Sequence, residues 1–251
     1  MPNPTAAMLV IGDEILSGRT RDSNTHYLAQ ELTKQGIDLR EVRVVSDDRP
    51  AIISAVKALS QGFDHVFTSG GIGPTHDDIT ADCIAAAFDA HIDVREDAHA
   101  ILAAHYERSG LELNAARLRM ARIPEGATLI DNPVSGAPGF QIENVRVMAG
   151  VPAVFEAMLE SVRSGLAGGP RVLSHSFRCE IGEGDLAGPL GEIASAFPDV
   201  SMGSYPFGGG AGAILVLRAT EREILAQAAA ALRSALAPLG GGASEAPPSP
   251  E

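Results

Sequence analysis

The chain has 251 residues, with 19 basic against 32 acidic side chains and a formal net charge of −13. This length allows one large domain, or a medium domain followed by a small one, with enough volume for a real core. The strong negative charge argues against wide contact with nucleic acid or anionic membrane, because neutralising phosphates requires a basic face.

Cysteine usage and the N-terminal residues indicate a soluble cytoplasmic protein. Cys83 and Cys179 are far apart in apolar surroundings, which is typical of buried thiols in a reducing compartment and not of a disulfide framework. Residues 1–5 lack the basic and apolar regions of a signal peptide. No apolar run approaches the roughly 18 residues that cross a bilayer. We therefore expect no membrane partner.

The first part of the chain alternates short apolar strands with amphipathic helices. The predicted strands are residues 8–11, 39–45 and 65–67, and the predicted helices are residues 23–36, 50–59 and 81–87. This alternation predicts an α/β fold, a three-layer α/β/α arrangement around a mostly parallel sheet. In such sheets ligands bind at the carboxyl ends of the strands, where Gly12, Asp47 and Gly70 fall.

The middle of the chain is predicted to continue this domain to about residue 165. Residues 96–120 have the pattern of one helix, and residues 129–130 that of a short strand. Residues 140–148 alternate as a single strand, and a helix follows to about Gly165. We therefore place the first domain at residues 5–165.

A glycine-rich linker at residues 165–170 leads to a second, smaller domain at residues 170–237. The order strand, helix, strand, strand, helix predicts an α+β module (residues 173–180, 185–197, 200–205, 213–219 and 221–236). A module of this size is marginal alone, so we expect it to pack on the first domain or on a second subunit. The tail, residues 240–251, is rich in Gly, Pro, Ser and Glu and is expected to be disordered.

Residues 68–80 form the most informative loop. Three glycines between a strand and a helix let the backbone approach a ligand and present N–H groups to an anion. Asp77 and Asp78 would repel a phosphate unless a cation lay between them. The alternative is a glycine turn in which one of these acids caps the next helix. The loop lacks the ending of a P-loop and the spacing of a dinucleotide-binding fingerprint.

Other loops are more ambiguous when taken singly. The acidic segment 12–18 is either a solvated turn or part of the same site. Asp48 is expected to cap a helix. For Asp47, a structural role and a role as a metal or ribose contact are equally expected. Residues 132–139 are either a rigid surface turn or a loop that closes over a ligand. His76 is a candidate base, although a hydrated loop histidine is more common, and residues 208–212 are expected to join two strands.

Together, segments 12–18, 70–78 and 132–139 resemble the MoaB/Mog molybdopterin-binding domain family. Within it, they are most similar to the version at the start of the competence/damage-inducible (CinA) proteins, and the resemblance covers about residues 5–165. The module at 170–237 resembles the KH-like domain that follows in those proteins. Their carboxy-terminal amidase domain has no counterpart in the sequence, so no amidase activity is expected.

The resemblance implies a small-molecule nucleotide or pterin ligand and a divalent cation such as Mg²⁺, with molybdopterin as a further candidate cofactor. CinA-type domains are associated with metal-dependent cleavage of ADP-ribose, and Asp47 and Asp78 match family positions tied to metal and catalysis. Gly70 to Thr75 match the phosphate cradle. Asp77 stands where adenylyltransferases usually carry a basic residue, which favours the CinA branch, and Ala149 departs from the proline of many relatives.

The resulting hypothesis places catalysis at Asp47, Asp77 and Asp78, with Asp47 and Asp78 as metal ligands. The predicted ligand-binding residues are Gly12, Asp13, Glu14, Ser17, Gly18, Asn24, Thr68, Gly70, Gly71, Gly73, Pro74, Thr75, Thr80, Asn132, Gly136, Pro138 and Gly139. Two alternatives stay open: a non-catalytic molybdopterin- or nucleotide-binding module, and a molybdopterin adenylyltransferase. A homo-oligomer is expected.

Overall fold

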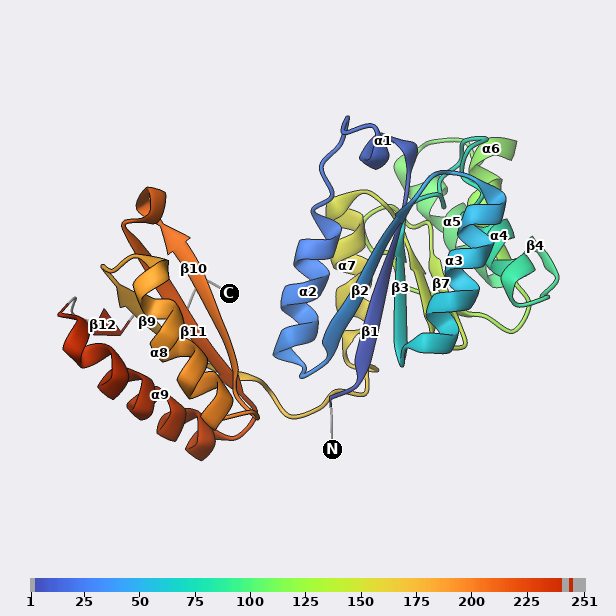
Figure 1. The fold of residues 1–251 in the computed structure, drawn as a ribbon. Coiled ribbons are helices and arrows are strands. Elements are labelled where there is room, and N and C mark those ends of the chain that lie inside the picture. The colour runs from blue at the N-terminus through green and yellow to red at the C-terminus, as the bar shows by residue number, and fades with distance from the viewer. Residues whose placement is uncertain (1–2, 241–243, 246–251) are drawn as a thin grey trace. The chain divides into compact units, whose positions relative to one another are not determined.

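The computed structural model describes residues 3–240 and 244–245, and its chain divides after Gly169 into two compact units (Figure 1). Each unit has a hydrophobic core of its own, two clusters in the first and one in the second. In the described part of the chain, no helix is long and apolar enough to span a membrane.

The first unit is built on a six-stranded sheet in the order β2-β1-β3-β8-β7-β6. The four strands β2, β1, β3 and β8 are parallel, and β7 and β6 are antiparallel to their neighbours. In sheet order the bounds are Asp38–Val45, Thr5–Ile11, His65–Ser69, Val145–Met148, Gly139–Ile142 and Thr128–Ile130. The prediction of an α/β fold with a mostly parallel sheet is confirmed.

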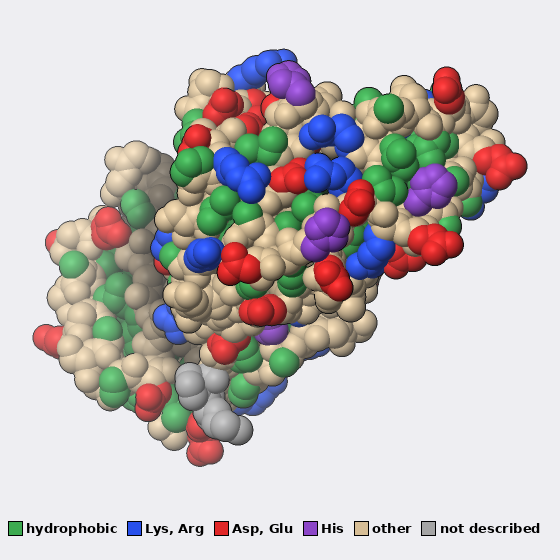
Figure 2. All heavy atoms as spheres, turned by 90° about the vertical axis from the view of Figure 1, so that its right-hand side faces the viewer, with side chains coloured by type: hydrophobic (Ala, Val, Ile, Leu, Met, Phe, Trp, Pro, Cys, Tyr) green, Lys and Arg blue, Asp and Glu red, His purple; other side chains and the backbone are tan. Residues whose placement is uncertain are grey.

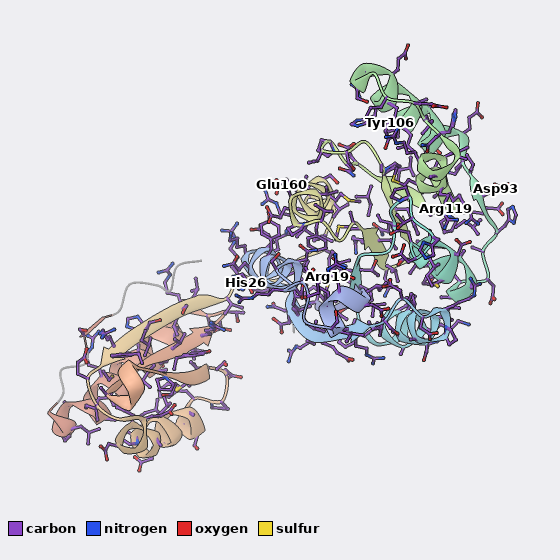
Figure 3. All side chains as sticks on the ribbon, turned by 90° about the horizontal axis from the view of Figure 1, so that it is seen from above. Arg19, His26, Asp93, Tyr106, Arg119 and Glu160 are labelled. Carbon is purple, nitrogen blue, oxygen red and sulfur yellow. The ribbon has the colours of Figure 1, made fainter. Side chains whose placement is uncertain are left out.

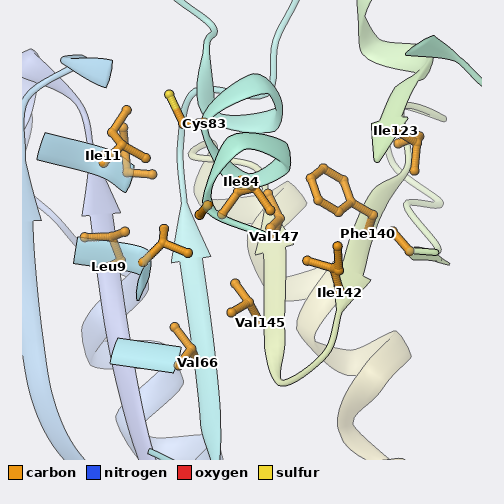
Figure 4. Close-up of a cluster of buried hydrophobic side chains, with 14 of the residues drawn as sticks. Leu9, Ile11, Val66, Cys83, Ile84, Ile123, Phe140, Ile142, Val145 and Val147 are labelled. Atoms are coloured by element: carbon orange, nitrogen blue, oxygen red, sulfur yellow. The ribbon is translucent and has the colours of Figure 1, made fainter. Parts of the chain in front are cut away.

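Helices cover both faces of this sheet. On one face lie α3 (Arg49–Gly62), α4 (Thr80–Ala87) and α5 (Glu96–Ser109), and on the other lie α2 (Asn24–Lys34) and α7 (Pro152–Arg163) (Figure 1). Strand β1 is apolar almost throughout because alternate side chains enter the two cores. Leu9 and Ile11 join the cluster that contains Val66, Ile84 and Phe140, as Figure 4 shows.

Aspartate side chains hold the first turns of two helices. Asp48 caps α3, because its carboxylate accepts the Ala51 N–H at 3.0 Å, as predicted. The start of α2 is fixed by Asp22, whose Oδ1 accepts the N–H groups of Asn24 at 3.0 Å and Thr25 at 3.2 Å. Short helix α1 (Asp13–Leu16) follows β1 directly.

Two sequence predictions in the first unit are wrong. Residues 96–120 are not one helix: α5 ends at Gly110, which has a φ of 67°, and α6 (Ala115–Leu118) and the 3-10 helix η1 (Arg119–Ala121) follow. Residues 140–148 are not one strand, because Glu143, with a φ of 48°, turns the chain between β7 and β8. A small sheet of β4 (Ile92–Val94) and β5 (Arg122–Pro124) was not anticipated.

The second unit is α+β, as predicted. Its antiparallel sheet has the order β10-β11-β9-β12, and α8 (Glu183–Ala196) and α9 (Arg222–Leu236) pack against it. The strands β10, β11, β9 and β12 span Ser201–Phe207, Gly212–Ala219, Leu173–Cys179 and Ser244–Glu245. The short η2 (Gly208–Gly210) joins β10 to β11, and η3 (Ala237–Leu239) follows α9.

The tail prediction is wrong for its two described residues beyond Gly240, because Ser244 and Glu245 pair with Arg178 and Phe177 of β9. The rest of the predicted disordered tail, residues 241–243 and 246–251, lies outside the described residues. Figure 2 shows acidic and basic side chains interspersed on one face of the protein.

Candidate functional site

The carboxyl ends of β1, β2 and β3 meet, as the sequence predicts. The Gly12 N–H donates to Val45 O at 3.1 Å, and the Asp13 N–H donates to Asp47 Oδ2 at 3.0 Å. Gly70 lies against β1, with a φ of 107°, and a Cβ at this position would be 2.1 Å from Ile11 O. Glycine is therefore required at position 70, because a side chain would collide with backbone.

The rest of the glycine loop is packed as closely. At Gly71, where φ is 69°, a Cβ would be 2.1 Å from Thr80 Oγ1. The Thr80 N–H donates to Gly71 O at 3.0 Å, while the buried Thr80 hydroxyl has no partner in the described structure. A Cβ at Gly73 would be 2.6 Å from Asp78 Oδ2. The loop thus folds tightly around the first turn of α4.

Neither acid of the loop caps α4. The residue at the cap position is Ile79, so the capping interpretation is wrong. Asp78 instead accepts two hydrogen bonds at Oδ2, from Thr75 N–H at 2.7 Å and from Thr75 Oγ1 at 2.5 Å. Asp77 stays exposed, beside the still more exposed His76. Asp78 is therefore a fixed carboxylate, whereas Asp77 is exposed and has Thr75 and His76 as its neighbours.

Asp47 lies among other acids. Burial is the first cause that raises the pKa of Asp47, and the negative charges of Asp13, Glu14 and Asp77 raise it further, against the hydrogen bond from the Asp13 N–H. Asp77, and not Asp78, is the loop acid whose charge acts on Asp47. Crowded carboxylates of this kind favour either a bound proton or a cation.

A first hollow opens beside the glycine loop. It brings together predicted residues from two loops, Gly71, Gly73 and Asp78 from one and Pro138 from the other. Two arginines that sequence reasoning missed, Arg119 and Arg122, complete its polar wall; Arg119 is labelled in Figure 3. The available signal was local: residues 117–122 hold three arginines in an otherwise acidic chain.

A second hollow lies beside α1 and the start of α2. Its walls include Glu14, Asn24, Ser69 and Gly150. Asn24 is buried and donates from Nδ2 to Ser69 Oγ at 2.7 Å and to Gly150 O at 2.8 Å, while its buried Oδ1 has no partner in the described structure. Asn24 thereby ties the start of α2 to the ends of β3 and β8.

The 132–139 loop is closed on itself. Asn132 is buried, and its Nδ2 donates to Ser135 Oγ and to Ala137 O, both at 2.7 Å. Its Oδ1 accepts the N–H groups of Val134 at 3.2 Å and Ser135 at 3.1 Å. A Cβ at Gly136 would be 2.5 Å from His105 Cγ, and one at Gly139 would be 2.3 Å from Val147 O. The side-chain hydrogen bonds of Asn132 therefore all lie within its own loop.

Most of the predicted ligand-binding residues lie outside the walls of both hollows: Gly12, Asp13, Ser17, Gly18, Thr68, Gly70, Pro74, Thr75, Thr80, Asn132, Gly136 and Gly139. Ser17 and Gly18 close the exposed turn after α1, and Thr68 is buried within β3. Among the described residues no group of three or more His, Cys, Asp or Glu side chains is arranged to hold a metal ion.

Comparison with known proteins gives consistent matches over both units. Residues 171–240 match the family described as the middle domain of FAD synthase. A protein of Archaeoglobus fulgidus is 34% identical over 204 residues, which are 79% of this chain and 84% of that protein. A probable FAD synthase of Caenorhabditis elegans is 34% identical over 227 residues, which are 80% of this chain and 44% of that protein.

A solved structure covers the first unit. The protein CinA of Thermoplasma acidophilum, whose function is described as unknown, is 34% identical with a TM-score of 0.60, over 64% of this chain and 97% of that one. Residues 7–167 match the family described as the probable molybdopterin binding domain. The chain therefore belongs to the probable molybdopterin-binding domain family, with its first unit similar to CinA.

Proposed function

We propose that the loop from Gly70 to Asp78 binds the phosphates of a nucleotide or pterin ligand, and that the chain cleaves a nucleoside diphosphate such as ADP-ribose in a metal-dependent reaction. The observation that carries this proposal is the meeting of a close-packed glycine loop with fixed carboxylates at the strand ends. Asp47 is held by the Asp13 N–H and Asp78 by Thr75. We also propose that the second unit is a KH-like domain.

The chemistry of the donors fits a hard divalent cation. The negative charges of Asp13, Glu14 and Asp77 act on Asp47, and a bound cation would relieve this repulsion. Mg²⁺ needs few protein ligands, because it is usually held by one or two carboxylates together with water and substrate phosphates. When bound, such a cation supplies charge neutralisation at the diphosphate and lowers the pKa of a coordinated water.

The chain's own residues supply position and polarity. The glycine loop allows a diphosphate to lie close to backbone. Asp78 cannot swing away, because both Thr75 donors hold one of its oxygens. Burial and the charges of neighbouring acids raise the pKa of Asp47, so this carboxylate accepts a proton more readily than an ordinary aspartate.

The relatives extend the substrate class to a second candidate. One of them is named a probable FAD synthase, and the second unit matches the middle domain of that enzyme. FAD and ADP-ribose both contain an adenosine diphosphate group, so a site that binds this group in one molecule can also bind it in the other. Both belong in the same assay.

The test is AMP release from ADP-ribose and from FAD, each with Mg²⁺, Co²⁺ or Ni²⁺. We expect Asp78→Asn to reduce the rate by on the order of 100-fold, whereas Asp38→Asn, at the opposite, amino end of β2, keeps the wild-type rate. Wild-type release no faster than that of Asp78→Asn refutes the cleavage reaction. In that case calorimetric binding of ADP-ribose or molybdopterin without product supports the binding module, and adenylylation of molybdopterin by ATP supports the transferase.

A further inference from the structure

Arg119 has an unusually poor set of partners for a half-buried guanidinium. Its Nη2 donates to Asp78 O at 3.4 Å, at the long end of a hydrogen bond. Its Nε is buried without a partner, and no carboxylate among the described residues forms an ion pair with it. A buried donor left unsatisfied costs free energy, and a half-buried guanidinium without a carboxylate partner is suited to pair with an anion that enters the hollow.

The neighbouring arginines are already engaged. Arg122 forms a bidentate pair with Asp82, with both distances 2.7 Å. Arg117 donates to Glu112 O and lies over the Tyr106 ring, 4.8 Å from its centroid. Of the two arginines that line the hollow, Arg119 is the one whose guanidinium forms no ion pair with a carboxylate of the described residues.

The position of Arg119 determines what it can meet. It shares the first hollow with Gly71, Gly73 and Asp78, and with an apolar wall that includes Ile72 and Phe140. The hollow therefore has a guanidinium and a glycine loop lining the same space. Arginine matches the oxygens of a phosphate with two parallel N–H groups, which a point charge cannot do.

The charges around the hollow leave the cation of Arg119 available. Asp82 is neutralised by Arg122. Asp78 turns one carboxylate oxygen to Thr75, and it meets Arg119 through its backbone carbonyl. Asp82 is thus paired with Arg122, and the hydrogen bonds to the Asp78 carboxylate come from Thr75, so Arg119 has no carboxylate partner in the described structure and can pair with an incoming anion.

We propose that Arg119 is a phosphate-binding residue of this hollow, and that it holds an oxygen of the diphosphate group of a nucleoside diphosphate. The residue comes from η1, outside the three loops that carry the family resemblance. The identity of the ligand rests on the proposed function, but the anion site does not depend on cleavage. Arg119 thereby orients the diphosphate against Gly71 and Gly73.

The experiment compares a ligand that has the diphosphate with one that lacks it. Dissociation constants of α,β-methylene-ADP, which cannot be cleaved at the bridge, and of adenosine are measured by NMR titration with Mg²⁺ present. The variants are Arg119→Ala, Arg119→Lys and the matched control Arg117→Ala. We expect Arg119→Ala to raise the dissociation constant of α,β-methylene-ADP on the order of 10- to 100-fold and to leave that of adenosine unchanged. Arg119→Lys should recover part of the loss, and Arg117→Ala should behave as wild type.

Each other outcome is decisive. Equal binding of α,β-methylene-ADP by wild type and Arg119→Ala overturns the assignment, and so does wild type that does not bind it. An equal loss for both ligands shows that Arg119 acts on the loop and not on phosphate, which also overturns it. If the expected pattern appears while no AMP is released from ADP-ribose or FAD, the phosphate site stands and the cleavage reaction is wrong.

Discussion

The loops 70–80 and 132–139 are both rich in glycine and proline, and both were predicted as parts of one site, yet their polar groups have different partners. In loop 132–139, Asn132 donates and accepts all of its hydrogen bonds within five residues of itself. In loop 70–80, the buried Thr80 hydroxyl has no partner in the described structure, and Asp77 is exposed. The two loops have similar compositions, but they differ in whether their polar side chains find hydrogen-bond partners within the loop.

The largest effect is expected at the tightest point of loop 70–80. In Gly70→Ala the new Cβ would meet Ile11 O at 2.1 Å, and φ is 107°, so the loop must move. Strain and overpacking together predict a loss of about 3 kcal/mol or more in the free energy of unfolding, measured by urea denaturation. The matched control is Gly110→Ala, which has a φ of 67° but no atom within 4 Å and should lose about 1 kcal/mol. Similar losses in both variants would show that the close contact does not matter.

The next effect separates the second loop from the first. Asn132→Ala leaves the Val134 and Ser135 N–H groups without their acceptor and removes two further bonds. We expect a loss of about 2–3 kcal/mol in stability, with the affinity of the folded protein for α,β-methylene-ADP close to wild type. A variant of normal stability that no longer binds the ligand would place Asn132 at the phosphate instead.

A smaller effect concerns the acids beside loop 70–80. The pKa of Asp47 is higher in the folded protein than in the unfolded chain. In the pH window between these two pKa values, the folded state therefore binds more protons than the unfolded state. Without divalent cations, the Asp47 contribution to stability therefore declines as pH rises through this window. Mg²⁺ competes with the proton, so its stabilising shift in Tm should be present at pH 7 and disappear as pH falls through the pKa of Asp47. A shift that is independent of pH contradicts the assignment of Asp47 as a cation ligand.

The smallest effect has the opposite sign from most substitutions. Asp47→Asn removes a charge that Glu14 and Asp77 repel and keeps an oxygen for the Asp13 N–H. Without divalent cations we expect it to stabilise the protein by about 0.5 kcal/mol or less, visible as a small rise in Tm. With Mg²⁺ present the order should reverse. Destabilisation in both conditions would mean that Asp47 has a structural role only.

The sequence alone predicts the α/β fold and the convergence of the first three strand ends, because both depend on local apolar patterns. It does not predict the hairpin at Glu143, since an alternating pattern is the same in one strand as in two. Nor does it place Arg119, which reaches loop 70–80 only because Gly110 ends α5 and the chain folds back through α6. The self-contained role of Asn132 depends on atomic distances that no spacing reveals.

Hydrogen–deuterium exchange compares the two loops in one measurement. The central claim is that loop 70–80 meets the diphosphate, whereas loop 132–139 holds its own shape. On addition of Mg²⁺ and α,β-methylene-ADP, we predict slower exchange of the amides in residues 70–78, with the rates of residues 133–136 unchanged. Slower exchange in residues 133–136 with no change in residues 70–78 would contradict the account.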